Sequence, residues 1–165
     1  MWYGIDVAPA PLREPGLRSA IQALQFPTGS RGLDAGCGIG LQALLLAEEV
    51  EPARQVTVLD LSPELLAYAE DLVENAGLSE RIAFREGDVN QLRFDDDTFD
   101  WACSVDLVGC ALVEALPLVK ELARVVKPGG SVAILALSSE KLLPGHPLLE
   151  ARLRATTLAG GWLVA

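Results

Sequence analysis

The 165-residue sequence has few of the residues that build metal sites and disulfides. It contains a single histidine, His146, and three cysteines, Cys37, Cys103 and Cys110, none of which has the spacing of a zinc site. We therefore expect no bound metal. An odd, unpatterned set of cysteines is typical of reduced thiols, so the sequence predicts a cytoplasmic protein.

Long apolar runs are missing as well. The longest candidate, residues 155–165, is well short of the ~20 apolar residues that span a membrane. The first residues lack the basic start and the apolar run of a secretory signal. We therefore expect neither a membrane span nor a secretory signal.

Basic residues are outnumbered, with 13 Lys and Arg against 23 Asp and Glu and a net charge of −10. An acidic surface repels phosphate, so we expect no nucleic-acid partner. The hydrophobic share of 50% is that of a folded protein. The length predicts one domain that covers residues 1–165.

What the sequence does contain is an alternation of strand and helix patterns. Strand patterns cover residues 32–35, 55–60, 82–86, 99–105 and 131–137, and helix patterns cover residues 16–25, 39–49, 63–76, 117–127 and 147–158. This alternation predicts an α/β fold, a doubly wound parallel sheet with helices on both faces. Such sheets bind ligands beyond the carboxyl ends of their strands.

A glycine-rich loop follows the first predicted strand, in the series Asp34-Ala-Gly36-Cys-Gly38-Ile-Gly40. Glycines let the backbone turn sharply and let a ligand approach it closely. A tight turn alone needs one glycine, so three beside an aspartate favour a ligand loop. The series does not fit the dinucleotide fingerprint G-x-G-x-x-G, because the third glycine would fall on Leu41 or Ala43.

Acidic residues also end the second and third predicted strands. Asp60 stands where a carboxylate accepts hydrogen bonds from ribose hydroxyls, and Asp88 could accept from an exocyclic amine. Taken singly, each also fits an ordinary turn. Acids after three successive strands together favour a ligand site.

These residues belong to a longer motif series, at residues 33–40, 59–60, 87–88, 99–100 and 124–130. The series resembles that of class I S-adenosylmethionine-dependent methyltransferases, over roughly residues 15–140 with a motif core at 30–137. It is most similar to the small-molecule branch of ubiquinone and menaquinone biosynthesis. The resemblance implies a Rossmann-like sheet of seven strands, of which this chain has five, as if truncated after strand five.

The resemblance also implies which residues bind S-adenosylmethionine: Asp34, Gly36, Gly38, Gly40, Asp60, Leu61, Asp88, Val89, Ser104 and Val105. The glycines would pack against methionine and ribose, with Asp34 near the ammonium end. Positions 60 and 61 would meet the ribose and adenine, and positions 88 and 89 the adenine amine and ring. Positions 104 and 105 would line the floor beneath the methionine part.

The implied reaction is in-line attack by a small-molecule acceptor on the sulfonium methyl group. A base is needed only if the acceptor must lose a proton early, and candidates are Asp106, Glu140 and His146. Asp106 follows the fourth strand, where a helix N-cap or loop residue is the alternative interpretation. We interpret Cys37 as a small filler of the loop.

Two other functions stay open. One is a non-catalytic or fragmentary cofactor-binding module that needs a missing C-terminal part or a partner. The other is a nicotinamide oxidoreductase, which the glycine spacing opposes.

The fifth strand, residues 131–137, is apolar and predicted to be buried, and neither Lys nor Pro interrupts it. An open edge there would invite a second copy of the chain, which predicts a homodimer.

Overall fold

The computed structural model describes residues 14–49, 56–107 and 115–135. All of them belong to one compact unit that spans residues 1–135. Cys110, the candidate bases Glu140 and His146, the predicted helix 147–158 and the end of the fifth predicted strand lie outside the described residues. The single domain over residues 1–165 therefore stays a prediction.

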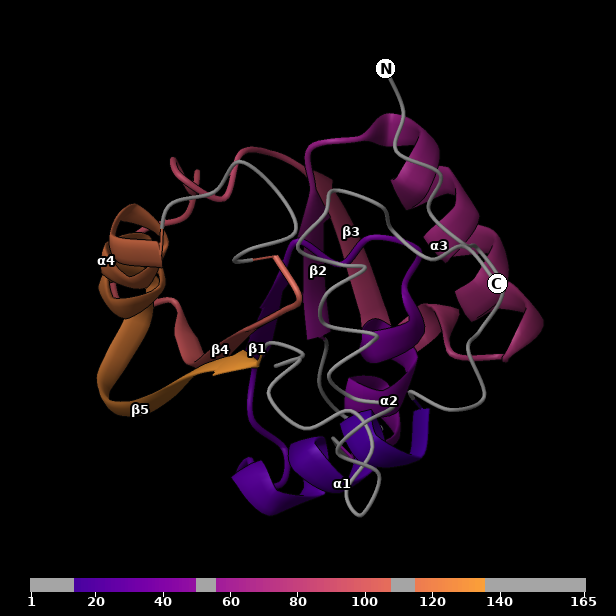
Figure 1. Ribbon diagram of the computed structural model, residues 1–165, viewed down its shortest axis with the longest axis horizontal. Helices are drawn as coiled ribbons and strands as arrows, with labels where there is room; N and C mark the ends of the chain where they lie inside the picture. Colours follow the sequence, from indigo (N-terminus) through magenta and orange to yellow (C-terminus); the bar gives the residue numbers. More distant parts are fainter. Residues whose placement is uncertain (1–13, 50–55, 108–114, 136–165) are drawn as a thin grey trace, which may run out of the picture. The chain divides into compact units, whose positions relative to one another are not determined.

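The centre of this unit is a five-stranded parallel sheet with the order β3-β2-β1-β4-β5 (Figure 1). Its strands are β1 (Gly32–Ala35), β2 (Val56–Asp60), β3 (Ile82–Glu86), β4 (Phe99–Val105) and β5 (Val126–Leu135). The chain adds β2 and β3 on one side of β1, then β4 and β5 on the other. The predicted α/β parallel sheet is confirmed, and its strand order reverses between β1 and β4, where such sheets bind ligands.

In the described ranges, one helix precedes the first strand, and three further helices and one short 3-10 turn lie between strands. They are α1 (Glu14–Leu24), α2 (Leu41–Glu49), α3 (Pro63–Asn75), η1 (Ser79–Arg81) and α4 (Ala115–Val125). Helix α3 begins as its sequence predicts, because the Ser62 hydroxyl accepts a hydrogen bond from the Leu65 amide at 3.3 Å and Pro63 occupies the first turn.

The two faces of the sheet bury separate apolar cores. On one face, α1, α2 and α3 pack over Trp101, whose indole donates to the Ser30 hydroxyl at 2.8 Å and stacks on Phe26. On the other face, Leu118 and Leu122 of α4 pack in the same core as Phe99. Figure 1 shows α4 on the opposite side of the strands from α2 and α3.

The end of the described chain differs from the sequence prediction. Helix α4 starts and ends two residues before the predicted 117–127, and β5 begins at Val126 rather than Ser131. The reason is pairing, since Val126 lies opposite Phe99 and a register shift then absorbs the residues up to Ser131. The predicted burial of the strand is wrong here. Val132 and Ile134 are 39% and 36% exposed, because β5 ends the described sheet and pairs there with β4 alone.

Candidate functional site

The glycine loop is fastened to the end of β2 by its backbone. The amides of Gly36 and Cys37 both donate to the Leu59 carbonyl, at 2.8 and 3.0 Å. The Gly38 amide donates to Oδ2 of Asp60 at 2.9 Å. The loop that follows β1 and the acid that ends β2 therefore form one hydrogen-bonded unit at the carboxyl edge of the sheet.

The three loop glycines face different surroundings. A Cβ atom on Gly40 would lie 2.7 Å from the Cβ of Ala69, and one on Gly36 would lie 2.9 Å from the Leu107 side chain. Among the described residues, a Cβ on Gly38 would meet nothing within 4 Å, although its φ of +53° is one that favours glycine. Packing against the protein thus accounts for two of the glycines, and Gly38 leaves room for a ligand.

Asp34 is a fully buried acid on β1, the central strand at this edge of the sheet. Its Oδ2 atom has no hydrogen-bond partner among the described residues, and its Oδ1 lies 3.9 Å from Sγ of Cys103. Burial, and then the negative charge of Asp60, raise the pKa of Asp34 to about 7. A buried carboxylate oxygen without a partner is costly, and it suits a cationic ligand group.

Ser104 presents a second such atom. It lies on β4, next to the residue that pairs with Asp34, and its buried hydroxyl also lacks a partner within the described ranges. Two orphaned polar atoms thus stand on β1 and β4, the strands between which the order reverses. Val105 follows Ser104 and is partly buried.

Asp60 uses both carboxylate oxygens to hold backbone, because Oδ1 accepts from the Ser62 amide at 3.0 Å while Oδ2 holds the loop. Each oxygen can accept a further hydrogen bond, so the group can still bind ribose hydroxyls. Beside it, Leu61 is 68% exposed, more than any other large apolar side chain that the structure describes. The adenine contact implied for Leu61 and the ribose contact implied for Asp60 stay predictions.

Asp88 forms a local turn, which is the alternative interpretation that the sequence left open. Its Oδ1 accepts from the Asn90 amide at 2.8 Å and from the Asn90 side chain at 2.9 Å. The neighbouring Val89 is 6% exposed and belongs to the core on the α4 face. The adenine contacts implied for these two residues stay a prediction.

Asp106, the candidate base, follows β4 with a φ of +54°, in the left-handed region that favours glycine. Its amide donates to the Leu135 carbonyl at 2.8 Å. The residue therefore stands at the correct edge of the sheet for a base, in a backbone conformation that the sequence did not indicate.

Cys37 and Cys103 are free thiols in the buried core. Burial, and then the negative charge of Asp34, raise the pKa of each thiol above the usual value for cysteine. They stay protonated and pack as small apolar groups, in agreement with the interpretation of Cys37 as a filler.

Some residues that hold the loop and the connection after Asp88 escaped the sequence analysis. Gln42 donates from its side chain to the Gly36 carbonyl at 3.2 Å, which fixes the loop from the α2 side. Glu121 and Arg124 form an ion pair that holds the connection after Asp88. The sequence signal that could have identified this ion pair is an acid and an arginine three positions apart on a helix.

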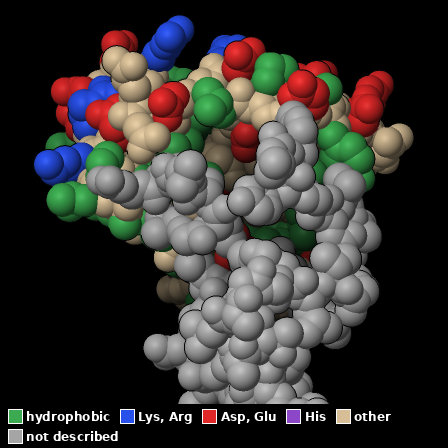
Figure 2. Space-filling model, turned by 45° about the horizontal axis from the view of Figure 1, so that its top comes forward, with side chains coloured by type: hydrophobic (Ala, Val, Ile, Leu, Met, Phe, Trp, Pro, Cys, Tyr) green, Lys and Arg blue, Asp and Glu red, His purple; other side chains and the backbone are tan. Residues whose placement is uncertain are grey.

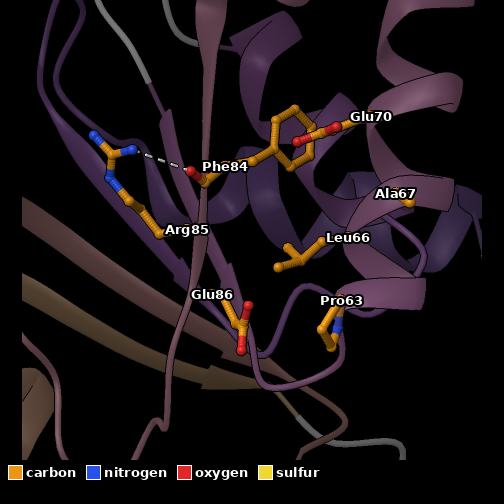
Figure 3. A pocket seen from close by; sticks show the side chains of 7 residues that line it. All are labelled: Pro63, Leu66, Ala67, Glu70, Phe84, Arg85 and Glu86. Carbon is orange, nitrogen blue, oxygen red and sulfur yellow. Dashed lines mark hydrogen bonds between the residues drawn. The ribbon is translucent and has the colours of Figure 1, made fainter.

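A hollow of about 250 Å³ lies between α3 and β3 (Figure 3). Its lining residues are Pro63, Leu66, Ala67, Glu70, Phe84, Arg85 and Glu86. None of the ten predicted cofactor-binding residues lines it. The hollow therefore borders the candidate site, since Glu86 pairs with Asp60, without including those ten residues.

The visible described surface mixes acidic and basic side chains without a broad basic patch (Figure 2). No helix within the described ranges is long and apolar enough to cross a membrane. In the same ranges, no group of three or more His, Cys, Asp and Glu side chains is placed to hold a metal ion.

Comparisons with known proteins match the same part of the chain. Residues 33–130 match a family model described as a methyltransferase domain. The demethylmenaquinone methyltransferase of Bacillus subtilis is 34% identical over 125 residues, which are 74% of this chain and 52% of that protein. The chain spans about half the length of the curated relatives that it matches.

Two solved structures share this fold, one named as a methyltransferase and the other as a cyclase. A crystal structure of a SAM-dependent methyltransferase from Aquifex aeolicus is 25% identical, with a TM-score of 0.71 over 92% of this chain and 82% of that one. The structure of the [4+2]-cyclase SpnF is 29% identical, with a TM-score of 0.64 over 81% of this chain and 48% of that one. Together with the strand order and the motif series, these matches show that the chain belongs to the class I S-adenosylmethionine-dependent methyltransferase family.

Proposed function

We propose that this chain binds S-adenosylmethionine at the carboxyl ends of β1, β2, β3 and β4 and transfers its methyl group to a small molecule. The observation that carries the proposal is the pair formed by Asp34 and Gly38. Among the described residues, the Oδ2 atom of Asp34 is a buried carboxylate oxygen without a partner, and Gly38 has open space where a side chain would stand.

The residues at this edge fit the parts of the cofactor. The carboxylate of Asp34 suits the ammonium group of the methionine part, and Asp60 has accepting capacity left for ribose hydroxyls. The exposed Leu61 side chain would lie against the adenine ring. Asp88 and Val89 would complete the adenine end, and Ser104 and Val105 the floor.

The cofactor supplies a methyl group that is already activated on a sulfonium. The chain's own residues therefore bind and orient it. Orientation of two reactants can contribute up to ~7–11 kcal/mol to lowering a barrier. Asp106 would accept a proton only from an acceptor that must lose one before it attacks.

A small molecule is the favoured acceptor. The net charge of −10 disfavours nucleic acid as acceptor. The Bacillus subtilis relative is named for demethylmenaquinone, so a demethylated quinone is the first acceptor to test. A cytoplasmic location and a homodimer through the β5 edge complete the proposal.

The experiment is a binding isotherm with S-adenosylmethionine and S-adenosylhomocysteine, followed by transfer of a labelled methyl group to a reduced demethylated quinone. Binding with transfer supports the proposal. Binding without transfer to any of a panel of small acceptors supports the alternative, a cofactor-binding module that needs more chain or a partner. Absence of binding by either ligand, with binding of a nicotinamide dinucleotide instead, contradicts both.

A further inference from the structure

The connection from β3 to β4, residues 87–98, differs from the other crossovers of the described sheet. The steps from β1 to β2, from β2 to β3 and from β4 to β5 each contain a helix, whereas this one contains none. It must also travel farther, because β2 and β1 lie between its two ends. Without a helix, its backbone polar groups need partners from elsewhere.

Two side chains of α4 supply the partners in the middle of this connection, at Leu92 and Phe94. Oε2 of Glu121 accepts from the Leu92 amide at 2.8 Å, and Nη2 of Arg124 donates to the Leu92 carbonyl at 2.8 Å. Both polar groups of one backbone residue are thus held by one ion pair. The guanidinium reaches further along the connection, since its Nη1 atom donates to the Phe94 carbonyl and to Asp96, each at 2.8 Å.

The ion pair is itself tightly built. Arg124 donates from Nε to Oε1 of Glu121 at 3.0 Å and from Nη2 to Oε2 at 2.9 Å, a two-pronged contact. The nearby guanidinium lowers the pKa of Glu121, so the carboxylate stays ionised at neutral pH. A lysine could not replace Arg124, because one ammonium lacks the planar fork that reaches two carbonyls and two acids at once.

The opposite end of the connection is fastened next to the proposed cofactor site. The Gly87 amide donates to the Asp60 carbonyl at 3.0 Å, on the residue whose side chain holds the glycine loop. Asp88 then caps a turn whose Gln91 amide donates to the Asp88 carbonyl at 3.1 Å. The turn with Asp88 and Val89 is therefore held from both ends. Gly87 before it binds the Asp60 carbonyl, and Leu92 after it binds the Glu121–Arg124 pair.

We propose that Glu121 and Arg124 are positioning residues for the cofactor, which hold Asp88 and Val89 at the adenine end of the site. They do this from α4, without touching the ligand. The inference rests on the proposed function, because it takes the adenine end from that proposal. Their contacts to the backbone of residues 92–94 replace the helix that the other crossovers possess.

The test compares Arg124→Met, Arg124→Lys and Glu121→Gln with the unchanged chain by calorimetry with S-adenosylhomocysteine. Arg18→Met is the matched control, because Arg18 is an ion-paired surface arginine on the other face of the sheet. We expect each α4 variant to weaken binding by about tenfold or more, which corresponds to the loss of ~1.4 kcal/mol. The control should bind as the unchanged chain does.

A double-mutant cycle separates positioning from general loss of stability. In an Asp88→Ala background, Arg124→Lys should weaken binding much less than it does alone, because both changes remove the same contact. Full additivity of the two losses would contradict the proposal. So would a lower melting temperature of Arg124→Lys with unchanged affinity. If Arg124→Met does not fold, Arg124→Lys and Glu121→Gln still decide the question.

Hydrogen exchange keeps this inference separate from the proposed function. In the chain without ligand, the amides of residues 90–92 should exchange faster in Arg124→Lys than in the unchanged chain, while those of β1 do not change. If the unchanged chain fails to bind S-adenosylhomocysteine, the proposed function fails. Unchanged exchange at Leu92 in the variant would instead overturn the role of the ion pair.

Discussion

The amide of Gly38 donates to Oδ2 of Asp60 across a distance of 2.9 Å, and this bond joins the two motifs that the sequence separates by 22 positions. The glycine loop after β1 and the acid at the end of β2 are therefore one structural unit. A change in Asp60 affects the loop as well as any ligand that the carboxylate binds, and experiments on either residue must allow for this link.

Replacing Asp60 should weaken S-adenosylhomocysteine binding. Asp60→Ala removes the acceptor for the Gly38 and Ser62 amides together with the predicted ribose contact, with an expected loss of roughly 1–3 kcal/mol. Asp60→Asn keeps one accepting oxygen and should lose less. Calorimetry measures both, with Asp71→Asn on the exposed side of α3 as control.

The ribose assignment has its own check. An analogue without the ribose 2′-hydroxyl should be less sensitive to Asp60→Asn than S-adenosylhomocysteine is. Equal losses for the two ligands would mean that Asp60 serves the loop and not the sugar.

Gly38→Val should abolish cofactor binding while the domain still folds. A Cβ there meets no atom of the described residues within 4 Å, so the side chain would take ligand space. The positive φ adds strain on the order of 1–3 kcal/mol. Gly77→Val is the matched control, because Gly77 has a φ of +71° and equally open space at the end of α3. The two variants should melt at similar temperatures, and binding by Gly38→Val would remove the ligand from this loop.

Gly40→Ala should act on stability instead. Its new methyl group would lie 2.7 Å from the Cβ of Ala69, which forces α3 away from the loop. We expect a loss of roughly 1–3 kcal/mol of unfolding free energy, as for overpacking of a core. Urea unfolding of Gly40→Ala beside Gly38→Ala measures the contrast, and equal stability of the two would contradict the packing role.

Asp34 should make stability fall as the pH rises. Because its folded-state pKa is raised from 3.8 to about 7, the folded chain binds a proton more tightly than the unfolded chain does. The stabilising effect of that proton is fully present below pH 3.8 and is lost as the pH rises through about 7. Between pH 5.5 and 7, the unchanged chain should lose ~2 kcal/mol relative to Asp34→Asn.

The comparison with Asp34→Asn cancels the other titrating groups, so the difference curve isolates this residue. A flat difference between pH 5.5 and 8 would show that the carboxyl group titrates normally. The proposed ammonium contact adds a second readout, because S-adenosylhomocysteine should bind more tightly to the unchanged chain as Asp34 loses its proton.

The β5 edge should pair with a second copy of the chain. In the described sheet β5 pairs with β4 alone, and its apolar side chains Val132 and Ile134 are exposed. Light scattering at micromolar concentration should give the mass of a dimer, and Val132→Lys should shift it toward the monomer. A soluble monomer of the unchanged chain would contradict the prediction.

The sequence by itself determined the order of elements. Strands β1, β3 and β4 lie where apolar runs end in glycine or acid, and Ser62, Pro63 and Gly77 mark the ends of α3. These signals are local, because capping and strand patterns act within a few residues. The motif series also named the family, since its glycines and acids stand at fixed places after successive strands.

Only the tertiary structure decided which glycine leaves room for a ligand and which residues hold the site together. Gly36, Gly38 and Gly40 look alike in sequence, and their difference comes from Leu107 and Ala69, which distant segments bring to the loop. The early start of β5 follows from its pairing with Phe99. The roles of Glu121 and Arg124 depend on a crossover that folds back onto α4. Long-range contacts of this kind have no local sequence signal, because they exist only once the sheet has formed.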